Sequence, residues 1–62
     1  MANPKKILNK EKIKNYISAG YSLDNIFNNL CLQFDDMESY QLFQDFQKGC
    51  SDFEISKKYF DN

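Results

Sequence analysis

The chain has 62 residues, of which 42% are hydrophobic and 16% aromatic, and its formal net charge at pH 7 is −1. A chain of this length predicts one domain with a thin stability margin, because a single small core rarely supplies more than about 3–5 kcal/mol. The sequence contains neither histidine nor arginine and no apolar run near the roughly 18 residues of a membrane span, which excludes histidine-based zinc and catalytic sites and a transmembrane helix.

The first predicted helix covers Lys10–Ala19. It follows residues 1–8, which are either a flexible basic arm or an additional helical turn. Asn9 is suited to cap the helix, and Gly20 is suited to end it in a left-handed conformation. The apolar side of this helix would carry Ile13, Tyr16 and Ile17.

The second predicted helix begins after Ser22, a favoured capping residue. Apolar residues then recur at the spacing of one helix face. They are Leu23, Ile26, Phe27, Leu30, Cys31 and Phe34. This pattern predicts an amphipathic helix that continues as far as Phe34.

Two capping boxes predict the third and fourth helices. Asp35 with Glu38 would open the third, and Ser51 with Glu54 would open the fourth, which runs to about Phe60. Gly49 would end the third helix. The expected apolar residues of these helices are Met37, Tyr40, Leu42, Phe43, Phe46, Ile55, Tyr59 and Phe60. The short connections predict an all-α fold, a compact bundle of four short helices forming a single domain over residues 1–62.

An offset of 29 residues superposes the two halves of the chain, so that Gly20-x-Ser22 coincides with Gly49-x-Ser51. Each half therefore predicts a helix, a glycine corner, a serine cap and a second helix. The corner resembles the one that precedes the recognition helix in helix-turn-helix regulators and recombinases. That resemblance implies DNA binding. The helix in the recognition position, which follows the first helix–corner–helix copy, however, begins Asp35-Asp36-Met37-Glu38, whose carboxylates a phosphate backbone would repel.

Candidate catalytic or metal-binding residues are scarce. The acids Asp35, Asp36 and Glu38 are better explained as helix caps than as a metal or acid–base cluster. Cys31 and Cys50 are expected to be reduced, packed thiols, since two cysteines without CxxC spacing give little support to a metal site or a disulfide. We therefore predict no catalytic residue, no metal and no cofactor.

The aromatic content predicts a protein-binding surface. Ten Phe and Tyr residues are more than so small an interior can hide, and exposed aromatic residues mark interfaces. We expect some rings to be exposed and to act together with the acidic surface of the third helix. The predicted partner-binding residues are Tyr21, Asp35, Asp36, Glu38, Tyr40, Phe53 and Phe60.

The leading hypothesis is a small non-enzymatic regulatory or inhibitory protein, of the kind that phages and mobile elements encode. It would bind another protein, for example a nucleic-acid-binding one with a basic surface. The alternative is a helix-turn-helix transcriptional regulator that contacts DNA through an N-terminal lysine cluster. That cluster comprises Lys5, Lys6, Lys10, Lys12 and Lys14. A homodimer is compatible with both. We expect a cytoplasmic protein without a membrane partner, because residues 1–15 are too polar for a secretory signal.

Overall fold

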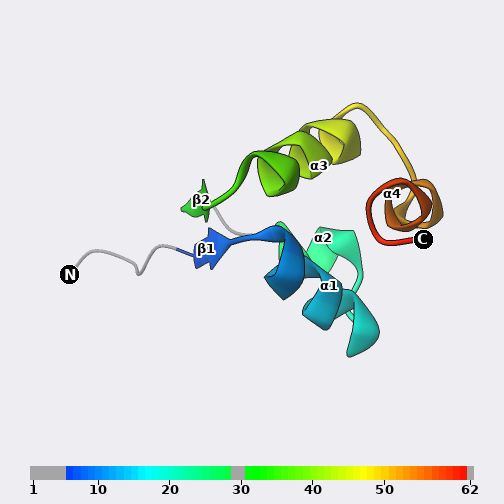
Figure 1. Cartoon of the computed structure of the whole chain (residues 1–62), viewed down its shortest axis with the longest axis horizontal. Helices are drawn as coiled ribbons and strands as arrows, with labels where there is room; N and C mark the ends of the chain where they lie inside the picture. The colour runs from blue at the N-terminus through cyan, green and yellow to red at the C-terminus, as the bar shows by residue number, and fades with distance from the viewer. Residues whose placement is uncertain (1–5, 29–30, 62) are drawn as a thin grey trace.

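The computed structural model describes residues 6–28 and 31–61. Six elements follow one another in chain order: β1 (Lys6–Leu8), α1 (Lys10–Ser18), α2 (Leu23–Ile26), β2 (Leu32–Phe34), α3 (Met37–Gln47) and α4 (Asp52–Tyr59). Helix α3 lies on one side of the molecule, α1 and α2 lie on the other, and α4 lies at the end away from the strands (Figure 1). The fold is mostly helical.

The prediction of an all-α fold is wrong in one respect, because β1 and β2 form a two-stranded parallel sheet. Leu8 is the Cα partner of Phe34, and the amide of Asp35 donates to the carbonyl of Leu8 at 2.8 Å. Parallel strands need a crossover connection, and here α1 and α2 provide it. The sheet therefore joins the beginning of the chain to its middle.

The second predicted helix is too long. Helix α2 ends at Ile26 with Phe27 as its C-cap, and Phe34 lies in β2. The ring of Phe34 still reaches the core, with its centroid 6.3 Å from that of Phe27. Phe34 therefore contacts the core as the apolar spacing predicts, but from a strand, because pairing with β1 overrides local helical periodicity. Leu30, another residue of the predicted helix face, lies outside the described residues.

The prediction that residues 1–8 form a flexible basic arm or a helical turn is wrong for residues 6–8. Residues 6–8 form neither a free arm nor a helical turn, because they pair with β2 and place Leu8 fully buried in the core. The remainder of the predicted arm, residues 1–5, lies outside the described residues and includes Lys5.

The two predicted glycine corners are confirmed. Gly20 and Gly49 have φ angles of +98° and +101°. The hydroxyl oxygens of Ser22 and Ser51 then accept hydrogen bonds from the amides of Asn25 and Glu54, at 3.3 and 3.2 Å. These corners turn the chain between α1 and α2 and between α3 and α4.

Gly49→Ala should lower the free energy of unfolding by about 1–2 kcal/mol, the usual cost of a positive φ for a residue with a Cβ. No other atom lies within 4 Å of the position that this Cβ would take, so the cost is one of backbone conformation and not of crowding. Gly49→Asn should cost less, because asparagine tolerates such conformations better. Urea denaturation of the three proteins measures the difference, and equal losses for Ala and Asn would contradict this explanation.

Aspartate side chains join equivalent helices of the two halves at their N-terminal ends. Asp36 caps α3 by accepting from the amide of Ser39 at 2.9 Å, while its other oxygen accepts from the amide of Lys10, the first residue of α1, at 3.1 Å. Asp52, the first residue of α4, accepts from the amide of Leu23, the first residue of α2, at 3.0 Å. The predicted capping box at Asp35 is therefore wrong by one residue, because the neighbouring carboxylate reaches two helices at once.

The core lies between the strands and all four helices. Its fully or nearly fully buried apolar members are Leu8, Ile13, Leu23, Ile26, Phe27, Leu42 and Ile55. Phe27 lies at the centre of an aromatic cluster, with ring centroids 5.0 Å from Phe43 and 5.1 Å from Phe46. Most of the remaining aromatic rings are only half-buried. Three others, those of Tyr21, Tyr40 and Phe53, are exposed at the surface.

Candidate functional site: a groove between α1 and α4

Four of the predicted partner-binding residues gather at the N-terminal end of α3. Asp35 is exposed, and Tyr40 is 46% exposed, with its ring centroid 5.9 Å from that of Phe34. Glu38 forms an ion pair with Lys10 at 2.9 Å. Both carboxylate oxygens of Asp36 accept from backbone amides, and hydrogen bonding by the Ser39 side chain is the main reason why the pKa of Asp36 lies below the ordinary aspartate value. The negative charge at this end of α3 is therefore partly neutralised by a lysine of the same chain.

Tyr21 lies apart from these residues, at the corner between α1 and α2. It is 53% exposed and packs edge-on against Tyr16, with ring centroids 5.6 Å apart. The predicted residues thus do not form one continuous surface; they occupy three places on the molecule.

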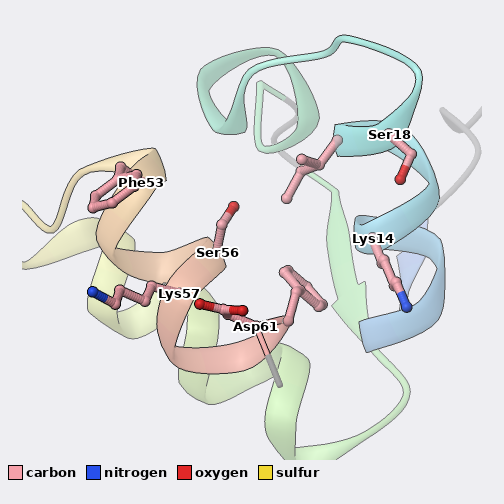
Figure 2. A pocket seen from close by; sticks show the side chains of 8 residues that line it. Lys14, Ser18, Phe53, Ser56, Lys57 and Asp61 are labelled. Atoms are coloured by element: carbon pink, nitrogen blue, oxygen red, sulfur yellow. The ribbon is translucent and has the colours of Figure 1, made fainter.

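The third place is a groove of about 430 Å³ between α1 and α4, hereafter the α1–α4 groove. Its lining residues are Lys14, Ile17, Ser18, Phe53, Ser56, Lys57, Phe60 and Asp61. Figure 2 shows Lys14 and Ser18 on α1 across from Ser56 and Asp61, with Phe53 at the far end of α4. Phe53 is 73% exposed, more than any other aromatic residue. Phe60, predicted to be exposed, is half-buried because it packs against the core.

Phe53 also lines a second hollow, of about 520 Å³. Asp45, Cys50, Glu54 and Ile55 are among its lining residues, and Phe53 and Lys57 line it together with the α1–α4 groove. Phe53 therefore borders two hollows, and the Lys57 ammonium group lies 5.8 Å from the centroid of its ring.

The lysines of the predicted basic cluster mostly have acceptors within the chain. Lys6 donates to the carbonyl of Ile26 at 2.6 Å, and Lys12 donates to the carbonyl of Ile7 at 3.3 Å. Lys10 is paired with Glu38. Lys14 alone among the four described members has no ion pair or hydrogen bond from its ammonium group to residues 6–28 or 31–61, and it lines the α1–α4 groove.

Asp45 is a buried carboxylate that the sequence analysis did not single out. Its oxygen accepts from the Tyr59 hydroxyl at 2.6 Å and from the Lys58 ammonium at 2.9 Å, which ties α4 to α3. These two contacts, the tyrosine first, hold the pKa of Asp45 below its ordinary value. Burial is the main cause of the raised pKa of Tyr59, and the hydrogen bond to Asp45 adds to it.

Tyr59→Phe should weaken the dependence of stability on acidic pH. Because the folded protein lowers the pKa of Asp45, the stabilisation is complete above the ordinary value of 3.8 and is lost as pH falls through the lower folded pKa. Without the hydroxyl, the folded pKa should move back toward 3.8. Urea denaturation from pH 6 to pH 2 should therefore give the variant lower stability at pH 6 and a shallower decline. An unchanged decline would contradict this role of Tyr59.

The described part of the chain offers no group of three or more His, Cys, Asp or Glu side chains that could hold a metal ion. Within the same residues, no helix is both long enough and apolar enough to cross a membrane. No family model, no curated protein and no solved structure matches this chain. The resemblance of the glycine corners to the helix-turn-helix family stays a prediction.

Proposed function

We propose that this chain is a small non-enzymatic regulatory or inhibitory protein that acts by binding another protein, with Phe53 and the α1–α4 groove as its docking surface. The observation that carries the proposal is the 73% exposure of Phe53 beside two hollows. Aromatic residues of this kind contribute disproportionately to binding energy when a partner covers them. Keeping such a ring in water is unfavourable by about 25 cal/mol for each Å² of apolar surface.

The shape of this surface favours a macromolecular partner. Phe53 is exposed and lines both hollows, so a partner pocket could enclose the ring while the partner's own side chains enter the hollows beside it. Ile17 and Phe60, both half-buried, supply further apolar area within the α1–α4 groove. This arrangement of a central aromatic anchor with apolar hollows around it is typical of protein interfaces.

The acidic end of α3 is a weaker candidate for the docking surface. Asp36 is held by two backbone amides and Glu38 by Lys10, so these carboxylates have fewer hydrogen-bonding positions left for a partner. Met37 is nevertheless 80% exposed in the same region. Met37 is therefore a useful comparison residue, since its side chain is also apolar and largely exposed but does not line the α1–α4 groove.

The test is co-purification of the tagged chain from cells of its source organism, with quantitative mass spectrometry of the retained proteins. Phe53→Ala should reduce retention of a specific protein at least tenfold, because removal of a central anchor costs about 2 kcal/mol or more of binding free energy, a factor of about 30. Met37→Ala should leave retention within a factor of about two.

Two results would overturn the proposal. One is a set of retained proteins that Phe53→Ala does not change. The other is tight, strongly salt-dependent binding of the wild-type chain to duplex DNA, with a dissociation constant below about 1 μM, since affinity that falls steeply with salt is the mark of phosphate neutralisation. Circular dichroism should first show that the Phe53→Ala and Met37→Ala variants are as helical as the wild type.

A further inference from the structure

Lys14 and Lys57 line the α1–α4 groove, and no carboxylate of the described residues forms an ion pair with either lysine. Lys14 is on α1 and Lys57 is on α4, and both are exposed. Neither forms an ion pair within residues 6–28 and 31–61, whereas Lys10 and Lys58 do. Figure 2 shows the two amino groups on opposite sides of the groove residues. An occupant of the groove would therefore have a positive charge at each side.

Apolar side chains lie between these two charges. Ile17, Phe53 and Phe60 line the groove together with the small polar residues Ser18 and Ser56. Among the described residues that line the groove, Asp61 is the one carboxylate, so their formal charge is +1. This combination suits a ligand that is apolar at its centre and negatively charged at its edges.

We infer that the docking partner presents to the α1–α4 groove an acidic amphipathic segment, with a bulky apolar side chain between carboxylates that approach Lys14 and Lys57. This inference rests on the proposed function and specifies the chemistry of the partner. Complementary charge at the rim of an interface mainly raises the association rate and excludes partners of the wrong sign, while the apolar centre supplies most of the affinity.

The probes are two fluorescently labelled, 15-residue helical peptides with the same leucine face, one with glutamate and one with lysine at the remaining charged positions. Fluorescence anisotropy at 20 and 150 mM salt should give at least tenfold tighter binding of the glutamate peptide to the wild-type chain. The preference should shrink at the higher salt concentration, because exposed charges are screened.

Three variants test the assigned side chains. Lys14→Glu combined with Lys57→Glu should reverse the preference between the peptides. Asp61→Asn should tighten binding of the glutamate peptide about two- to fivefold, because it removes the only like charge in the lining. Lys48→Glu is the control for added negative charge outside the groove, since Lys48 is exposed at the C-terminal end of α3 and is not among the residues that line the groove; it changes the net charge by two, and the double lysine variant changes it by four. It should leave the preference for the glutamate peptide intact.

The outcomes separate this inference from the proposed function. Equal binding of both peptides, weakened by Phe53→Ala, would overturn the acidic partner and leave the docking surface in place. Binding of neither peptide, together with partner retention that Phe53→Ala does not affect, would overturn both. Self-association in sedimentation experiments that the double lysine variant abolishes would assign the groove to a second copy of the chain and would also overturn the inference.

Discussion

Leu42→Ala should leave a large fraction of the protein unfolded at 25 °C. Leu42 is completely buried in α3, within the core between α3 and the other elements. Truncation of a buried leucine costs about 2–5 kcal/mol through lost apolar contacts and the remaining cavity. A core of this size provides about 3–5 kcal/mol in total, so the loss is comparable to the whole stability.

Met37→Ala is the matched control, because it lies in the same helix but is 80% exposed. It should change the free energy of unfolding by no more than about 0.5 kcal/mol. Urea denaturation followed by far-ultraviolet circular dichroism measures both variants. A loss below about 1 kcal/mol for Leu42→Ala would contradict the position of this side chain in the core.

Asp36→Ala should have the second-largest effect, a loss of about 1–3 kcal/mol. Removal of a helix cap alone costs about 0.5–2 kcal/mol. Asp36 caps α3 and also accepts from the first amide of α1, so a second backbone donor loses its partner. Asp35→Ala is the control: the side chain of Asp35 is exposed, and its bond to Leu8 comes from the backbone amide, which the variant keeps. Thermal unfolding that ranks the two variants in the opposite order would contradict the double cap.

The same carboxylate should contribute to sensitivity to acid. The pKa of Asp36 is lowered, chiefly by its hydrogen bond with Ser39. Its stabilisation is therefore complete above the ordinary value of 3.8 and declines as pH falls through the lower folded pKa. Asp36→Asn should remove this part of the acid dependence while keeping one hydrogen-bond acceptor, and denaturation curves at pH 6 and pH 3 would measure the difference.

The helices whose ends carry strong local signals were predictable from the sequence. Gly20 and Gly49 need positive φ, and Ser22 and Ser51 accept hydrogen bonds from the first turns that they cap, so these boundaries depend on neighbouring residues alone. Strand β2 was not predictable in this way. Its formation depends on Lys6–Leu8, about 26 positions earlier, and Phe34 fits a short strand as well as the predicted helix face.

The candidate site was predictable only in part. The exposure of Tyr21, Tyr40 and Phe53 followed from an excess of rings over core volume, but nothing in the order of residues showed which of these rings lie near one another. The groove joins α1 to α4 and depends on tertiary packing. Lys57 was therefore missed, although its position one helical turn after Phe53 was a signal that could have drawn attention to it.

The parallel pairing of β1 with β2 has a consequence for folding during synthesis. Leu8 leaves the ribosome before its strand partner Phe34, which is made 26 residues later, so β1 stays unpaired for a time with a core leucine exposed. Closing so long a loop also carries an entropic cost that local helical contacts do not. A deletion within residues 6–8, or a fused segment that disturbs them, would thus impair folding of the whole chain, including the distant surface formed by α4.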